Sequence, residues 1–184
     1  ASVKVPTFSW LKITGLDTVL GPEMKSTGEA MGHGPNFGTA YLKAMKGGNK
    51  KLPTKGTVFL SISNKLKLEF ENVARELIDL GFNIIATKGT AAHLRKNGLK
   101  SKVIWRISDK RQPDILSVMR RGNVDLIINL PTGRRAATDG AQMRRLAVEL
   151  GIPFITTLTG AKAAIDSLKE GESDYLKPLK KIKF

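Results

Sequence analysis

From Thr57 onward, short apolar runs alternate with segments of helical periodicity, and this alternation constrains the fold more than any other feature of the chain. Residues 57–63 (TVFLSIS) are a β-branched apolar run of strand length. In 67–81 the apolar residues recur at helical spacing, and Gly81 marks the stop. The pattern then repeats, with expected strands at 82–86, 102–105, 124–130 and 153–157 and expected helices at 90–98, from 113, at 138–150 and from about 160. Such alternation predicts a doubly wound α/β domain with about five parallel strands covered by helices on both faces.

The first 55 residues do not join this pattern. Residues 36–47 (NFGTAYLKAMKG) predict a helix, and the glycines, proline and lysines of 47–56 indicate a linker. Residues 1–35 have a short apolar start and too few apolar positions for a complete core. We therefore expect 1–35 to be the end of another domain, 36–55 to be a helix and linker, and 56–184 to be the α/β domain.

The net charge of +15 is the strongest feature of the composition. It favours anionic partners such as phosphorylated metabolites or nucleic acid, but a lysine-rich solvated surface has the same composition. The absence of cysteine excludes disulfides and thiolate metal sites. His33 and His93 lie far apart without a second metal ligand nearby, so no metal site is predicted. No apolar run reaches about 18 residues and no signal peptide is visible, so we predict a soluble, cytoplasmic protein without a membrane partner.

Polar residues follow each predicted strand, at the edge of the sheet where α/β proteins bind ligands. They are Ser61 and Ser63, ATKGT (86–90), Arg106, NLPTGRR (129–135), and Thr156 with Thr157. Hydroxyls, glycines and arginines at a helix start suit phosphate. Each also has an ordinary structural interpretation, since threonines cap helices and the arginine pairs 120–121, 134–135 and 144–145 are typical of solvated faces. These turns hold no carboxylate or histidine, so no catalytic residue is predicted.

Several motifs resemble a known family. LDTVLGPEMKSTGEAMG (16–32) closely resembles the end of the second ATP-grasp half of the carbamoyl-phosphate synthetase large subunit. KGTVFLSI, GFNIIATKGTAAHL, DLIINLPTGRR and RRLAVELGIPFITTL resemble the allosteric domain that follows it, which has the methylglyoxal-synthase-like fold. The resemblance implies that 1–35 are the C-terminal remnant of an ATP-grasp domain and that 56–184 are the allosteric domain.

The resemblance also implies a function. The parent enzyme makes carbamoyl phosphate from bicarbonate, glutamine or ammonia, and two ATP, for pyrimidine and arginine biosynthesis. ATP and Mg would bind in the parent enzyme, whereas this fragment would hold no cofactor and would not catalyse alone. Its partners would be the rest of the large subunit, a glutaminase small subunit, and an effector resembling UMP or IMP.

Effector-binding residues are carried over by position. Lys67, Thr87 and Thr90 align with residues that hold the nucleotide phosphate, as does Arg106, where lysine is usual in the family. Asn129 aligns with an asparagine of the turn that follows the fourth predicted strand. Pro131 replaces a threonine, Leu130 also departs from the pattern, and Thr132 is the nearest hydroxyl. Arg134 and Arg135 are further candidates for phosphate, and Thr156 aligns with a threonine that contacts ornithine in bacterial members.

Two other function classes remain open. Methylglyoxal synthase, a lyase of the same fold, needs catalytic aspartates, a histidine and a GP-GGD-like loop, where this chain has LPTGRR. A basic nucleic-acid-binding protein would agree with the charge, but aromatic residues are only 6% and no binding motif is present. We therefore expect no lyase activity, and only weak, sequence-independent nucleic-acid binding. We also expect residues 1–35 to be loosely held.

Overall fold

The computed structural model describes residues 1–9, 24–131 and 135–170, with side chains from Asp139 onward in the last range. Its centre is a parallel sheet with the strand order β5-β4-β3-β6-β7. The strands are β3 (Gly56–Ile62), β4 (Phe82–Ala86), β5 (Lys102–Val103), β6 (Leu126–Leu130) and β7 (Phe154–Ile155). The predicted doubly wound α/β fold is confirmed, because five parallel strands lie between two layers of helices.

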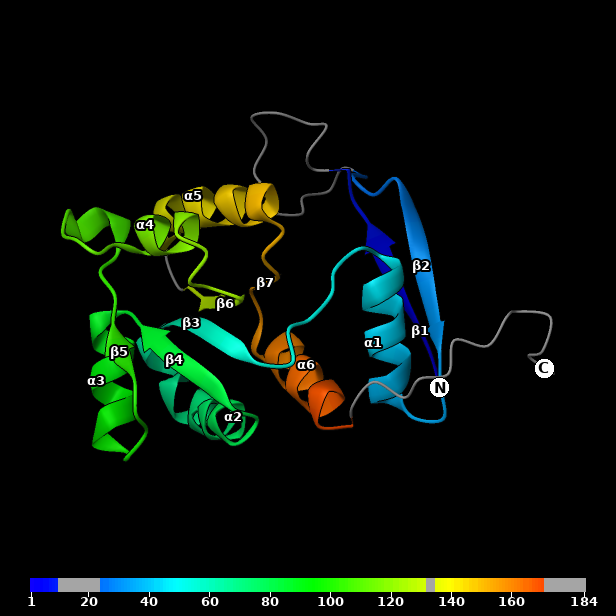
Figure 1. The fold of residues 1–184 in the computed structure, drawn as a ribbon, viewed down its shortest axis with the longest axis horizontal. Helices are drawn as coiled ribbons and strands as arrows, with labels where there is room; N and C mark the ends of the chain where they lie inside the picture. Colours follow the sequence, from blue (N-terminus) through cyan, green and yellow to red (C-terminus); the bar gives the residue numbers. More distant parts are fainter. Residues whose placement is uncertain (10–23, 132–134, 171–184) are drawn as a thin grey trace.

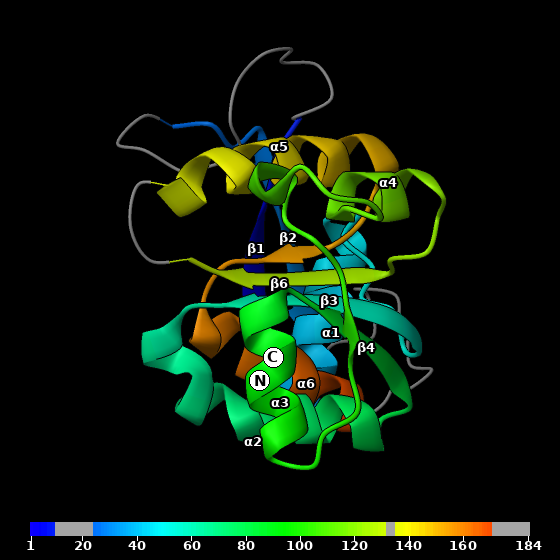
Figure 2. The ribbon, with the colours of Figure 1, turned by 90° about the vertical axis from the view of Figure 1, so that its left-hand side faces the viewer.

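Side chains on the two faces of the sheet form two separate apolar clusters. One face is covered by α2 (Lys67–Asp79), α3 (Lys88–Lys96) and α6 (Leu158–Glu170), and the other by α4 (Ile115–Arg120) and α5 (Arg135–Leu150), as Figures 1 and 2 show. Along β3, Val58 and Leu60 join the first cluster and Phe59 joins the second. This alternation is the two-residue period of a strand buried on both sides, and it explains the continuous apolar run in the sequence.

Several element boundaries differ from the predicted ones. The helix expected at 90–98 begins earlier, at Lys88, because the turn that leaves β4 is a single residue, Thr87. The helix expected from 113 begins at Ile115, because Asp114 caps it by accepting a hydrogen bond from Ser117 N at 2.8 Å. Short 3₁₀ turns precede two helices, at Asn64–Leu66 and Ile107–Asp109. The helix expected at 138–150 begins at Arg135, and the last strand is shorter than predicted.

The N-terminal part is a two-stranded antiparallel hairpin covered on one side by a helix. β1 (Ser2–Thr7) pairs with β2 (Gly28–His33), and α1 (Phe37–Gly47) lies across them and also packs against α6, on the right of Figure 1. The predicted helix at 36–47 is therefore confirmed. A Cβ on Gly32 would collide with the backbone of Ala40 and Ala44, so the glycine of the GEAMG motif serves close strand–helix packing. In the described part of 1–35, Val5 is the only buried hydrophobic side chain.

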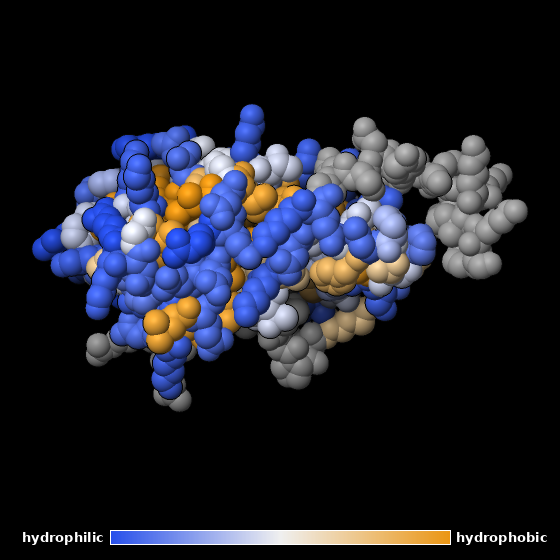
Figure 3. All heavy atoms as spheres, turned by 90° about the horizontal axis from the view of Figure 1, so that it is seen from below, coloured by the Kyte–Doolittle hydropathy of each residue, from blue (hydrophilic) through white to orange (hydrophobic). Residues whose placement is uncertain are grey.

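The surface is largely hydrophilic. Seen from below in Figure 3, polar side chains cover most of the molecule and apolar atoms show between them. Large exposed apolar side chains are Met24, Met31, Phe37, Leu68 and Leu150. Within the described ranges, none of the helices has the length and apolar character needed to cross a membrane.

Candidate anion-binding site

The sheet order places the polar turns around one point. β3 is the first strand of the domain, and the chain then extends the sheet to one side through β4 and to the other through β6. In open α/β sheets this reversal leaves a crevice beyond the carboxyl ends of the strands, where ligands bind. Ser61 on β3 and Asn129 on β6 face each other in register at that edge. The candidate site therefore lies where β3, β4 and β6 end.

The start of α3 presents backbone N–H groups at this edge. Thr87 N donates to Leu60 O at 3.1 Å, and the first helical bond recorded there runs from Ala91 N to Thr87 O at 2.8 Å. Lys88, Gly89 and Thr90 lie between these two bonded residues and form the first turn of the helix. Their N–H groups have no preceding helical carbonyl to which they could donate. Lys88 and Gly89 are exposed. This helix start is suited to an anion, because its open N–H groups and the helix dipole both favour negative charge.

Thr90 fastens that helix start to the central strand. Its side chain is buried, and Oγ1 accepts hydrogen bonds from Ile62 N at 3.0 Å and from Thr87 Oγ1 at 3.1 Å. Both predicted threonines are thus brought together, and their hydroxyls already have partners in the fold. The open backbone N–H groups are the part of this turn left for a ligand.

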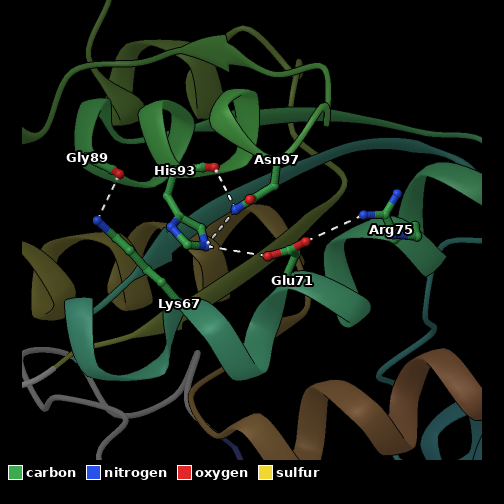
Figure 4. A network of polar contacts seen from close by, with 6 residues as sticks. All are labelled: Lys67, Glu71, Arg75, Gly89, His93 and Asn97. Carbon is green, nitrogen blue, oxygen red and sulfur yellow. Dashed lines mark hydrogen bonds and ion pairs between the residues drawn. The ribbon is translucent and has the colours of Figure 1, made fainter.

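Lys67 reaches the same turn from α2. Its Nζ donates to Gly89 O at 2.8 Å (Figure 4), and an ammonium carries three donors, so two remain. One helical turn further on, Glu71 Oε2 lies 3.9 Å from His93 Nε2 of α3, which also contacts Asn97. The two helices are therefore linked by polar contacts beside the anion position, and Lys67 adds a positive charge to it.

Arg106 is placed differently from the other predicted phosphate residues. Its side chain is 60% exposed, and Nε lies 3.5 Å from Asp109 Oδ2, which also accepts from Arg106 N at 3.1 Å. Within the described structure, Arg106 has no hydrogen bond or ion pair with Lys67 or the two threonines. It holds the 3₁₀ turn of Ile107–Asp109 and would have to leave Asp109 to reach a ligand at α3.

The end of β6 supplies a buried amide. Asn129 is 3% exposed, and in the described structure its Nδ2 has no hydrogen-bond partner. Thr156 is exposed directly after β7, in the position that follows the Ile128–Ile155 pair and so lies beside Asn129. Leu130 points into the apolar core and Pro131 is exposed. Predicted residues Thr132 and Arg134 lie outside the described residues, and of Arg135 only the backbone, at the start of α5, is described.

One residue of this region was misassigned from the sequence. The pair Arg144–Arg145 was expected to lie on a solvated face, but only Arg145 does, with 58% of its side chain exposed, whereas Arg144 is 7% exposed. Helical spacing could have indicated this, because Arg144 recurs at intervals of three or four residues with the small and apolar residues on the buried side of α5. These are Gly140, Met143 and Ala147. Ser63, after β3, also has a buried Oγ without a partner in the described structure. The ranges with assigned structure contain no cluster of three His, Asp or Glu that could hold a metal ion.

Comparison with known proteins identifies the class of domain. Residues 69–156 match the family model described as an MGS-like domain. This chain therefore contains an MGS-like domain, and the candidate site is built on it.

The chain is also homologous to a particular group of enzymes over most of its length. It is 48% identical over 174 residues to the carbamoyl phosphate synthase large chain, C-terminal section, of Methanocaldococcus jannaschii, covering 93% of this chain and 28% of that protein. The corresponding section from Methanopyrus kandleri is 44% identical over 91% of this chain and 31% of its own length. The large chain of Archaeoglobus fulgidus is 48% identical over 94% of this chain and 16% of its own length. The chain thus belongs with the C-terminal section of carbamoyl phosphate synthase large chains, and spans less than a third of the length of these relatives.

Proposed function

We propose that this chain is the regulatory domain of a carbamoyl phosphate synthase large chain, and that it binds a nucleoside monophosphate with the phosphate at the start of α3. The observation that carries the proposal is the position of Lys67, whose Nζ lies 2.8 Å from Gly89 O at a helix start with open N–H groups. A phosphate there would accept from the backbone and from the remaining donors of Lys67.

The wider role follows the relatives. In this proposal the synthase makes carbamoyl phosphate from bicarbonate, glutamine or ammonia, and two ATP, with ATP and Mg bound elsewhere in the large chain. Residues 1–35 are then the end of its ATP-grasp domain, 36–55 are a helix and linker, and 56–184 are the allosteric domain. Ornithine at Thr156, a glutaminase partner, and roles in pyrimidine and arginine synthesis belong to the same proposal.

In the described structure, the carboxylates nearest the turns make local hydrogen bonds, which supports regulation over catalysis. Asp109 and Asp139 are the carboxylates closest in sequence to the turns, and both are used locally. Asp109 accepts from Arg106 N, and Asp139 of α5 accepts from Ser108 Oγ at 2.7 Å. Both carboxylates therefore hold the 3₁₀ turn in place, which is a structural role. Methylglyoxal synthase chemistry would need at least one of them released toward the ligand.

The test is calorimetry of UMP, IMP and uridine with wild type and Lys67→Ala at fixed ionic strength. One charge-assisted hydrogen bond contributes about 1.5–3 kcal/mol, so loss of Lys67 should weaken the nucleotides by roughly tenfold to a hundredfold. Uridine has no phosphate, and it should bind poorly to both proteins.

Lys96→Ala is the matched control, because it removes the same charge from an exposed position at the other end of α3. Its nucleotide affinity should stay close to wild type. If no nucleotide binds wild type, the proposed function is wrong. If nucleotides bind and Lys67→Ala binds them equally well, the phosphate does not lie at α3.

A further inference from the structure

More than half of the net positive charge lies on one side of the sheet. Residues 88–121 contain ten lysines and arginines and two aspartates, so they carry a charge of +8 out of the total of +15. They form α3, β5, the 3₁₀ turn of Ile107–Asp109 and α4, on the left of Figure 1, the side that faces the viewer in Figure 2. Soluble proteins usually intersperse charges of both signs on their surfaces, so this concentration indicates an anionic partner.

The two aspartates on this side leave most of the positive charge without a counter-charge. Asp109 Oδ2 lies 3.5 Å from Arg106 Nε, and Asp114 caps α4 by accepting from Ser117 N at 2.8 Å. In the described structure, neither carboxylate forms an ion pair with the exposed lysines on this side of the sheet. These lysines are Lys88, Lys96, Lys100, Lys102 and Lys110. Such unpaired like charges repel one another, and a bound anion relieves that repulsion.

An aromatic ring lies beside these charges. Trp105 follows β5 and is half-buried, and its backbone is fixed, since its N donates to Pro113 O at 3.2 Å and its O accepts from Ile115 N at 3.1 Å. The exposed guanidinium of Arg111 lies over the ring, 4.8 Å from the ring centroid. An aromatic ring and a guanidinium are flat surfaces on which nucleobases stack, and this stacking tolerates any base.

The charges next to this ring follow the edge strand. Lys100 and Lys102 precede Trp105, and both are exposed. The turn that carries Lys100 is held by Arg95, whose Nε and Nη2 donate to Ser101 O at 3.0 and 2.6 Å. At about 3.3 Å per residue, Lys100 and Trp105 lie roughly 17 Å apart along the strand. This linear array suits an extended polyanion better than a single small anion.

We propose that this surface binds a single-stranded nucleic acid. We name it the basic edge and define it as Lys100, Lys102, Lys110 and Arg111 around Trp105. The lysines contact successive phosphates, and a base stacks on Trp105 and Arg111. The interaction does not depend on base sequence, because phosphates and stacking faces are common to all nucleotides. It is separate from the proposed function, since it uses β5 and the turn after it in place of the start of α3.

Other anionic or basic partners fit this surface less well. An acidic protein segment would pair with the lysines but would leave the stacked pair of Trp105 and Arg111 without a role. A second copy of the chain would bring together two molecules that each carry a net charge of +15. The combination of a line of lysines with a stacking platform is the arrangement that binds single strands.

The test is fluorescence anisotropy of a labelled oligouridylate with the full chain over a series of salt concentrations. Each phosphate contact on a single strand contributes about 0.7 to the slope of log affinity against log salt. The double variant Lys100→Gln/Lys102→Gln should therefore lower the magnitude of that slope by about 1.4 and weaken binding at low salt by about tenfold. Trp105→Leu keeps every charge, so it should leave the slope unchanged and weaken binding about tenfold through lost stacking.

Lys46→Gln/Lys51→Gln is the matched control, because it removes two exposed charges at and just after the end of α1. Its affinity and slope should stay close to wild type, and thermal melts establish that each variant is folded. A second readout leaves Trp105 in place. In a Trp10→Phe background, an oligouridylate should quench the fluorescence of Trp105, and polyglutamate should not.

Several results would overturn the inference. They are absence of oligouridylate binding at low salt, an equal loss of affinity in the control and in the Lys100 and Lys102 variant, and no quenching of Trp105. Polyglutamate that competes as well as an unlabelled strand of equal charge would identify an acidic protein segment as the partner. UMP binding is measured in the same proteins and should not change in the variants of the basic edge. Its absence from wild type would contradict the proposed function alone.

Discussion

Thr90 shows how a residue predicted for binding can also be required for folding. Its hydroxyl accepts from Ile62 N at 3.0 Å in a buried position between α3 and β3. Thr90→Val keeps the shape of the side chain but leaves that backbone N–H without an acceptor. The cost of a buried unbonded donor is about 1–3 kcal/mol, so we expect the free energy of unfolding to fall by that amount in urea denaturation.

The control for this prediction is Thr156→Val. Thr156 is exposed and its hydroxyl makes no hydrogen bond in the described structure, so stability should change by less than about 0.5 kcal/mol. If the two variants had equal stability, the hydrogen bond of Thr90 to β3 would contribute nothing measurable.

For single residues, the sequence predicted which side chains lie near the candidate site better than it predicted their hydrogen-bond and ion-pair partners. Lys67, Thr87 and Thr90 were placed at one turn, and the structure brings them together there. Arg106 was assigned to the same phosphate, but its pairing with Asp109 depends on a 3₁₀ turn that has no clear sequence signal. Arg144 was missed because a charged residue on a helix is usually solvated, whereas this one lies among the buried positions of α5.

Among the elements, α1 has a side chain whose ionisation should be coupled to folding. Tyr41 stacks on Phe37 with ring centroids 5.7 Å apart, and burial raises the pKa of its hydroxyl above the ordinary value of 10.0. As pH rises past the unfolded pKa, the unfolded chain loses this proton while the folded protein keeps it. The unfolded state is then favoured, and stability falls from about pH 10 upward.

Tyr41→Phe isolates this effect. The variant cannot ionise and retains the ring, so its stability should match wild type near neutral pH and exceed it increasingly above about pH 10. Urea denaturation across that range is the measurement, and lysine titration affects both proteins alike. Parallel stability curves from neutral to alkaline pH would show that Tyr41 is equally solvated in the folded and unfolded states.

The identity of most elements was predictable and their ends were less so. Helical spacing in 67–81 and the apolar runs of 57–63 and 124–130 all correspond to observed elements, because burial on one or two faces produces a clear period. Helix starts depend instead on single turns and caps. Thr87 and Asp114 each shift a start by two residues from the predicted position.

On the scale of the whole molecule, the hairpin and the sheet should differ in local stability. Val5 is the only buried hydrophobic side chain in the described part of 1–35, and an isolated two-stranded hairpin is marginally stable. β3 and β6 lie in the middle of a sheet covered on both faces. Hydrogen exchange should therefore be fast for the amides of β1 and β2 and slow for those of β3 and β6.

Both sets of amides are measured in one sample, so β6 serves as the internal reference. Equally slow exchange in β2 and β6 would contradict the expectation that 1–35 are loosely held. It would mean that α1 stabilises the hairpin as strongly as the helices stabilise the sheet.

The strand order could not be read from the sequence. Alternating strands and helices predict a parallel sheet, but several orders satisfy right-handed connections. The observed order depends on which side of β3 each later strand joins, and this is decided by packing across the whole sheet. The position of the candidate site where β3, β4 and β6 end therefore required the structure, although Lys67, Thr87, Thr90 and Asn129 were named from the sequence.

The close packing of α1 on α6 has a consequence for the segment that joins α1 to β3. A Cβ on Gly38 would collide with Glu170 and meet Ser167 Cα at 3.0 Å, so the first and last described helices touch directly. Residues 48–55 connect the two parts covalently, whereas their relative orientation is held by this contact. Leu52 of this segment is buried in the same apolar cluster as Val58 and Leu60, so the segment is also fixed to the sheet and is not a hinge. Extra residues inserted between Thr54 and Lys55, which are exposed, would lengthen the connection at a small entropic cost and leave the docking of the two parts intact.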